Sequence, residues 1–150
     1  MPHLRLEYAV GTDDAALIET LVTKLHAQMV ASSVFPTAGI RVRAFKADHA
    51  IVADGDARNG FVAMQLSVGA GRSTEVLKVE GDQLFQIAQS CLADQLAEPY
   101  FALSLEIHEI NGDLSWKDTP IHARLSKPKG KSEGSCDGSS RANRSSSCSY

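Results

Sequence analysis

The chain has 150 residues, of which 43% are hydrophobic and 22% charged, and its formal net charge at pH 7 is −3. This length and composition are typical of one soluble globular domain with a core of its own. No apolar run approaches the ~20 residues of a membrane span, and the N-terminus lacks the pattern of a signal peptide. The three cysteines offer neither a disulfide framework nor closely spaced metal ligands, so the sequence predicts a cytoplasmic protein.

Charge is distributed unevenly along the chain. Residues 127–150 hold five Lys/Arg and two Asp/Glu among many Ser and Gly, which leaves residues 1–126 with a net charge of −6. A segment of this composition cannot bury enough apolar surface to fold. We therefore expect one folded domain over residues 1–126 and a disordered basic tail over residues 127–150. The negative charge of the folded part argues against binding to nucleic acid.

The first half of the chain predicts a strand, a helix and a second strand. Residues 2–10 alternate between apolar and polar side chains, as a half-buried strand does. Thr12 is a candidate N-cap for the next segment, and Asp13 and Asp14 suit its first turn. Apolar residues then recur at helical spacing, at Leu17, Ile18, Leu21, Val22, Leu25 and Met29. After the turn FPTAG, the alternating stretch IRVRAF (residues 40–45) predicts the second strand.

The same order repeats about sixty residues later. GFVAMQLSV (residues 60–68) predicts a strand, Ser73 is a candidate N-cap, and residues 100–110 predict a fourth strand. The helix between them is marked by Leu77, Leu84, Ile87, Ala88 and Cys91. A helix between two strands requires parallel strands joined by a right-handed crossover. We therefore expect an α+β fold, built from a duplicated β-α-β unit, with one four-stranded sheet and two helices on one face.

Two other segments have weaker patterns. Residues 114–125 could add a short strand or pack against a neighbouring subunit. The loop DGDARNG begins like a calcium-binding loop, but Arg58 occupies a ligand position and Gln65 replaces the bidentate glutamate, so we predict no metal there. The five histidines are scattered and are interpreted as structural or surface groups.

Pro2 allows two interpretations. Proline has no backbone N–H, so it is often found at the start of an edge strand. A small second residue also usually permits removal of Met1, which would leave Pro2 with a free secondary amine, a base that no internal residue offers. Arg41 follows a Pro/Gly turn and Arg72 lies in a glycine turn that opens a helix, where anions bind readily. Nearby cations and burial would make such an amine lose its proton more easily.

Four stretches, in this order, resemble the 5-carboxymethyl-2-hydroxymuconate isomerase family of the tautomerase superfamily. They are MPH at the start, FPTAGIRVRAF at 35–45, GAGRS at 69–73 and SLEIHEI at 104–110. The stretch VGAGRSTEV is also similar to the helix start in 4-oxalocrotonate tautomerase, a half-length relative. The resemblance covers roughly residues 2–126 and excludes the tail.

The resemblance implies a homotrimer of βαββαβ subunits that needs no cofactor. Pro2 matches the catalytic base, Arg41 and Arg72 match the arginines of the substrate pocket, and Arg43 falls within the same matching stretch. The second unit has Gly60–Phe61 where the first has Met1–Pro2, so only one unit can supply the amine and a trimer would hold three active sites.

The implied substrate is an unsaturated tricarboxylate from bacterial homoprotocatechuate breakdown. Neutral Pro2 would take the proton of the 2-hydroxyl group and return a proton at carbon five. The arginines would hold carboxylates and stabilise the developing charge.

Alternatives from two classes remain open. The same proline could serve another tautomerisation, a hydration-based dehalogenase or a decarboxylase. The domain could also be a binding module without activity, and retention of Met1 would favour that reading because it caps the amine.

The sheet face away from the helices carries mixed side chains that suit a partly polar subunit interface. They are Arg5, Glu7, Arg41, Phe45, Gln65 and Glu106.

Overall fold

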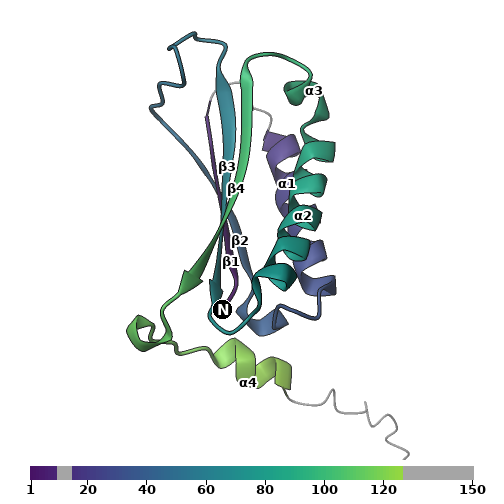
Figure 1. Cartoon of the computed structure of the whole chain (residues 1–150), viewed down its shortest axis with the longest axis vertical. Coiled ribbons are helices and arrows are strands. Elements are labelled where there is room, and N and C mark those ends of the chain that lie inside the picture. The colour runs from purple at the N-terminus through teal and green to yellow at the C-terminus, as the bar shows by residue number, and fades with distance from the viewer. Residues whose placement is uncertain (10–14, 127–150) are drawn as a thin grey trace, which may run out of the picture.

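The computed structural model describes residues 1–9 and 15–126, so the expected cap at Thr12 and the tail over residues 127–150 lie outside the described residues. Its elements follow one another along the chain as Figure 1 shows. They are β1 (His3–Tyr8), α1 (Ala15–Ala31), η1 (Thr37–Gly39), β2 (Arg41–Lys46), β3 (Gly60–Gly69), α2 (Thr74–Cys91), α3 (Ala93–Leu96), β4 (Phe101–Ile110), η2 (Gly112–Leu114) and α4 (Pro120–Ser126).

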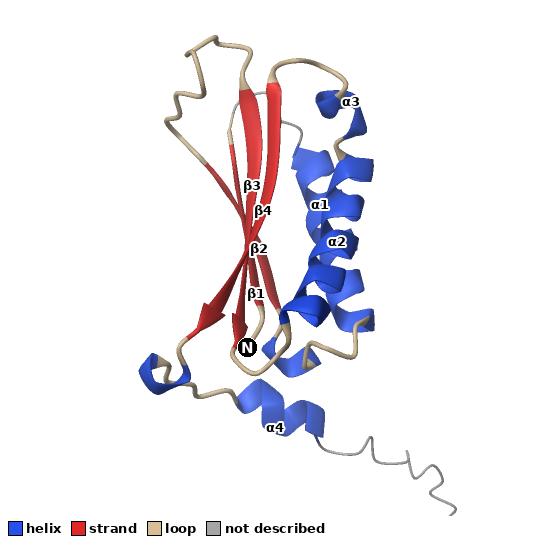
Figure 2. Ribbon diagram, in the orientation of Figure 1, coloured by secondary structure: helices blue, strands red, loops and turns tan. Residues whose placement is uncertain are grey.

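The four strands form one sheet in the order β2-β1-β3-β4. Strands β1 and β2 are parallel, and so are β3 and β4, as expected when a helix joins each pair. The two β-α-β units meet through antiparallel pairing of β1 with β3. Both long helices, α1 and α2, cover the same face of the sheet (Figure 2). The expected α+β fold with a duplicated unit is therefore confirmed.

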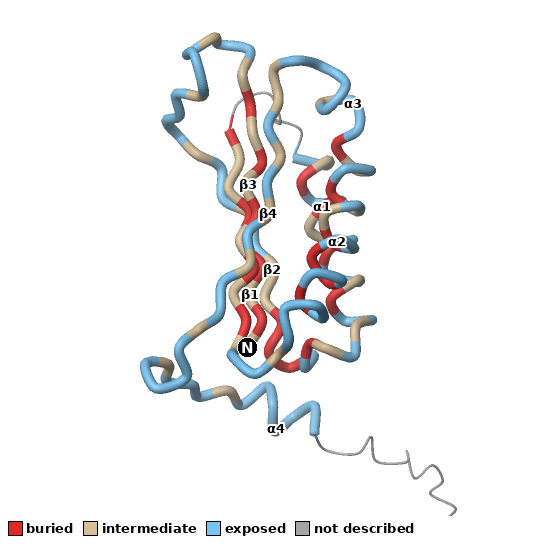
Figure 3. The backbone as a smooth tube through the Cα atoms, viewed as in Figure 1, coloured by how far each residue is buried: buried red, intermediate tan, exposed pale blue. Residues whose placement is uncertain are grey.

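The core lies between the sheet and these two helices (Figure 3). Its largest fully buried side chains are Leu4, Leu6, Leu21, Leu25, Met29, Met64, Leu66, Leu84 and Leu92, with Val62 and Val68. The apolar residues of β4 that pack against the core, Phe101, Leu103, Leu105 and Ile107, are only partly buried, because β4 is an edge strand. Ser73 caps α2 as expected, since its hydroxyl accepts a hydrogen bond from the Val76 N–H at 3.3 Å.

The expectation of a short strand in residues 114–125 is wrong. The segment instead contains the end of η2 and the helix α4, which begins at Pro120. Proline suits the first position of a helix, because its fixed φ is helical and its missing N–H needs no partner there. Helix α4 packs against η1 below the end of the sheet that carries the N-terminus (Figure 1). The alternative that this segment packs against a neighbouring subunit stays a prediction.

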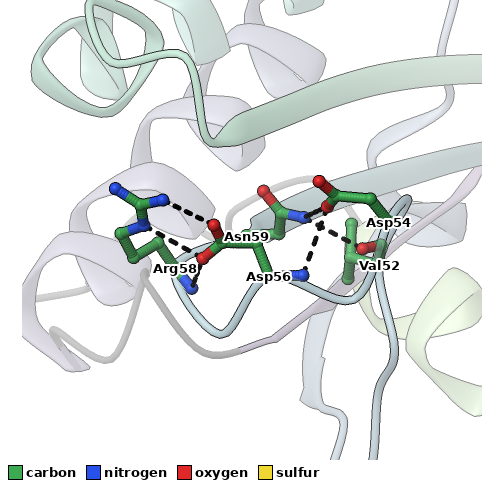
Figure 4. Close-up of polar contacts among 5 residues, drawn as sticks. All are labelled: Val52, Asp54, Asp56, Arg58 and Asn59. Atoms are coloured by element: carbon green, nitrogen blue, oxygen red, sulfur yellow. Dashed lines mark hydrogen bonds and ion pairs between the residues drawn. The ribbon is translucent and has the colours of Figure 1, made fainter.

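The loop between β2 and β3 is held by its own polar groups (Figure 4). The Asp56 carboxylate accepts from the Nε and the backbone N–H of Arg58, both at 2.9 Å, and this pairing lowers the pKa of Asp56. Asp54 accepts from the Asn59 side-chain amide at 2.8 Å. Both carboxylates are thus engaged with donors of the loop itself.

The described residues contain no helix that combines the length and the apolar character needed to cross a bilayer.

Candidate active site

Topology brings the three main candidate residues to one end of the sheet. Strands β1 and β2 are parallel and therefore begin at the same end, which places Pro2 next to Arg41. Strand β3 runs the other way and ends there, so the turn that carries Arg72 lies at this end too. The first backbone link across the site is the Arg41 N–H, which donates to the Pro2 carbonyl at 3.1 Å.

Pro2 is buried, and η1 packs directly on it. A Cβ placed on Gly39 would lie 3.0 Å from Pro2 Cδ and 3.2 Å from Met1 Cα. Only glycine allows this approach without displacing the N-terminal residues. The turn FPTAG therefore does more than separate α1 from β2, because its glycine forms the wall against which Pro2 sits.

The N-terminal amine lies in a positive environment. Burial lowers the pKa of the Met1 amino group, and Lys117, Arg72 and Arg41 lower it further, because each disfavours the ammonium form. Met1 precedes Pro2 in the described chain, so the Pro2 nitrogen belongs to a peptide bond and is not a base. Removal of Met1 would move the free amine one residue further in, to the buried Pro2.

Arg41 is held by the backbone that leads into β2. Its Nη1 donates to the carbonyls of Ala38 and Ile40, at 3.0 and 2.9 Å. Its Nε and Nη2 have no hydrogen-bond partner within residues 1–9 and 15–126. Arg41 therefore keeps one edge of its guanidinium for a carboxylate.

Arg72 is fixed more firmly than Arg41. Its Nε and Nη2 donate to the Val34 carbonyl at 3.2 and 3.0 Å, and its Nη1 donates to the Gly69 carbonyl at 2.9 Å. A guanidinium has five N–H groups, so two of them remain for a ligand. Arg72 thus bridges the end of β3 and the segment after α1 while keeping donors for an anion.

The segment that holds Arg72 is itself anchored from α2. The Val34 N–H donates to the Ser32 hydroxyl at 3.0 Å, and this hydroxyl donates to the Glu80 carboxylate at 2.8 Å. Glu80 is buried, with 7% of its surface exposed. A chain of contacts therefore runs from Glu80 through Ser32 and Val34 to the Arg72 guanidinium.

Replacing Ser32 with alanine is expected to lower the free energy of unfolding by about 1–3 kcal/mol, because the Val34 N–H and the Glu80 carboxylate both lose a partner. Denaturant unfolding measures this change. Ser90→Ala is the matched control, since that hydroxyl is exposed and donates only to a carbonyl of its own helix. Equal losses for the two variants would contradict the anchoring role of Ser32.

His3 and Arg43 lie on the open face of the sheet, which is the face that carries no helix. The His3 Nε2 is buried and has no partner among the described residues. Burial lowers the pKa of His3, and Arg43, the N-terminus, Arg41 and Lys117 lower it further. Arg43 itself does not act on the N-terminal amine, and its guanidinium lies 6.0 Å from the Phe45 ring.

Sequence reasoning missed two groups at this site, His3 and Lys117. The scattered spacing of the histidines predicts a structural or surface role for His3, although its position directly after Pro2 is a usable signal. Lys117 lies in residues 114–125, whose pattern favours a short strand or a subunit contact, and no motif marks this lysine. Its closeness to the amine depends on the path of the chain from β4 to α4.

The fold and the site define the class of protein. A four-stranded sheet built from two β-α-β units, with both helices on one face, is the fold of the tautomerase superfamily. The family model of 5-carboxymethyl-2-hydroxymuconate isomerase matches residues 2–125. The chain belongs to this family, as its sequence motifs indicated.

Individual relatives agree with this placement. The 5-carboxymethyl-2-hydroxymuconate Delta-isomerase of Escherichia coli is 34% identical over 123 residues, which cover 82% of this chain and 98% of the relative. A crystal structure of a 5-carboxymethyl-2-hydroxymuconate isomerase from Deinococcus radiodurans R1 has a TM-score of 0.78 and 38% identity, covering 84% of this chain and 95% of its own. A symmetric trimer of fused 4-OT has a TM-score of 0.53 at 18% identity, covers 71% of this chain and 85% of its own, and shows the fold alone.

Proposed function

We propose that this chain is an isomerase that converts 5-carboxymethyl-2-hydroxymuconate to 5-carboxy-2-oxohept-3-enedioate, with the amine of Pro2 as the acid and base. The observation that carries the proposal is the placement of Pro2, which is buried between η1 and β1 with Arg41 and Arg72 beside the amino group. The relatives from Escherichia coli and Deinococcus radiodurans R1 are named as isomerases of 5-carboxymethyl-2-hydroxymuconate, and the site offers the groups that this reaction needs.

The reaction is a proton transfer coupled to a shift of double bonds. Neutral Pro2 takes the proton of the 2-hydroxyl group, and the electron pair released forms the carbonyl at carbon two. The double bond moves to carbons three and four, and carbon five receives a proton from the Pro2 ammonium. No atom is gained or lost, and the amine ends the cycle neutral, as it began.

Arg41 and Arg72 would hold carboxylates of the substrate and stabilise the negative charge of the dienolate. Their guanidinium groups are positioned by backbone carbonyls before a ligand arrives, so little reorganisation is needed when charge develops. Arg43 lowers the pKa of His3 but is not among the cations that lower the pKa of the Met1 amino group, so we assign it to the rim of the pocket. A cytoplasmic location is part of the proposal and is based on the cysteine usage of the sequence.

The test combines two measurements on the purified chain. Mass spectrometry of the N-terminus is expected to show that Met1 is absent, and the absorbance of the conjugated substrate is expected to change on addition of the protein. Full retention of Met1 together with no turnover would instead support a binding module. If the chain converts a different unsaturated acid but not 5-carboxymethyl-2-hydroxymuconate, it has one of the other proline-dependent activities named above, such as another tautomerisation.

We also propose that the subunit assembles as a homotrimer. The open face of the sheet carries an Arg5–Glu7 ion pair, and the Arg5 guanidinium lies 5.2 Å from the Phe45 ring. Such a face is too polar for a core and suits a partly polar interface. Sedimentation at micromolar concentration is expected to show three copies, and a monomer would contradict the proposal.

A further inference from the structure

A cavity of about 310 Å³ opens beside the N-terminus, between two walls from distant parts of the chain. Met1, Ala38 and Gly39 belong to one wall, and Lys117, Thr119 and His122 belong to the other. The second wall comes from the segment that passes below the end of the sheet and leads into α4 (Figure 1). The cavity therefore borders the amine and the glycine against which Pro2 packs.

The formal charges that line this cavity, the Met1 amine and Lys117, are both positive. Lys117, Arg72 and Arg41 each lower the pKa of the Met1 amino group, so three cations act on the N-terminus. None of the described residues that line the cavity carries a carboxylate, and Lys117 forms no ion pair within residues 1–9 and 15–126. An unpaired lysine in the wall of a cavity that also offers a hydroxyl and an imidazole is suited to a carboxylate.

The substrate carries three carboxylates, but of the three candidate arginines only Arg41 and Arg72 lower the pKa of the N-terminal amine, and Arg43 is assigned to the rim of the pocket. The muconate chain has a carboxylate at each end and a third on the carboxymethyl arm, whereas Arg41 and Arg72 account for two. The third cation lies outside the duplicated β-α-β units, which end with β4 at Ile110. Lys117 is thus one cation more than the two β-α-β units provide at the N-terminus, and the carboxymethyl arm is one carboxylate more than Arg41 and Arg72 hold.

We propose that Lys117, with Thr119 and His122, forms a third anionic subsite that binds the carboxymethyl carboxylate. The inference rests on the proposed function, because it assumes that the amine of Pro2 acts on a tricarboxylate. This third subsite would make the segment from η2 to α4 the part of the chain that selects a substrate with a carboxymethyl arm. Lys117 is then a binding residue and takes no part in the proton transfer.

The test compares Lys117→Gln with the unmodified enzyme on two substrates. One is 5-carboxymethyl-2-hydroxymuconate, and the other is 2-hydroxymuconate, which lacks the carboxymethyl arm. We expect KM to rise about tenfold for the first substrate and to stay unchanged for the second, because a hydrogen bond to a charged group is lost only in the first case. Lys24→Gln on α1 is the control and is expected to change neither value.

Equal rises for both substrates would overturn the subsite, because Lys117 would then act on the amine or on the fold. So would unchanged values for both. If the unmodified enzyme converts neither substrate, the proposed function fails, and calorimetry then tests the subsite alone. Lys117→Gln should weaken binding of propane-1,2,3-tricarboxylate about tenfold while leaving binding of pentanedioate unaffected. The inference is overturned if the variant and the unmodified chain bind the tricarboxylate equally well, or if the unmodified chain does not bind it.

Discussion

Replacing Pro2 with alanine is expected to lower kcat by ~10²–10⁴-fold, the usual range for a general acid or base. Removal of Met1 would leave a primary amine in nearly the same place, so the fold should survive while the basicity and geometry of the base change. Steady-state kinetics with the tricarboxylate substrate measures the loss, and denaturant unfolding confirms that the variant is folded. Full activity of Pro2→Ala would refute the catalytic assignment.

The pH profile of the unmodified enzyme gives an independent check. Burial and the cations Lys117, Arg72 and Arg41 lower the pKa of the Met1 amino group, and we expect the same groups to lower the pKa of the Pro2 amine once Met1 is removed. The base is active when neutral, and kcat/KM is therefore expected to rise with pH, with its midpoint below that of a free prolyl amine. A form with a residue retained before Pro2 should lose activity at every pH, because its proline nitrogen is an amide.

Replacing Arg72 with alanine is expected to raise KM and to lower kcat, with a combined loss in kcat/KM of ~10²–10³-fold. A carboxylate contact made in both the ground state and the transition state affects KM, and a donor aimed at developing charge affects kcat. Arg72→Lys should recover little, because an ammonium cannot bond the Val34 and Gly69 carbonyls while presenting a fork to the ligand.

The matched control is Arg58→Ala, in the loop at the other end of the sheet, where the guanidinium pairs with Asp56 (Figure 4). This variant also replaces an arginine with alanine, but far from the candidate site. We therefore expect its kcat and KM to stay within twofold of those of the unmodified enzyme. A loss of activity in Arg58→Ala as large as that in Arg72→Ala would mean that general destabilisation explains both. Thermal unfolding of both variants separates these cases.

Local patterns in the sequence were sufficient for the four strands, the two long helices and the pairing of strands within each unit. Alternation of apolar side chains predicts β1 and β3, and helical spacing predicts α1 and α2, because each pattern reflects which face of an element is buried. Ser73 could be assigned as an N-cap for the same reason, since a cap acts within one turn. The parallel pairing followed from the length of the crossovers, and the family followed from four short motifs.

Contacts between distant residues could not be read in this way. Gly39 packs on Pro2, and the Arg72 guanidinium binds the Val34 carbonyl, 38 residues away in sequence. Residues 114–125 show why local patterns are insufficient there, because a short amphipathic segment has no strong preference until it meets a surface. The sequence by itself determined the two β-α-β units, and it named Pro2, Arg41 and Arg72 as candidates for the chemistry. Only the tertiary structure decided that η1 and the segment of Lys117 line one cavity beside the amine, because that placement depends on where the chain goes after each unit ends.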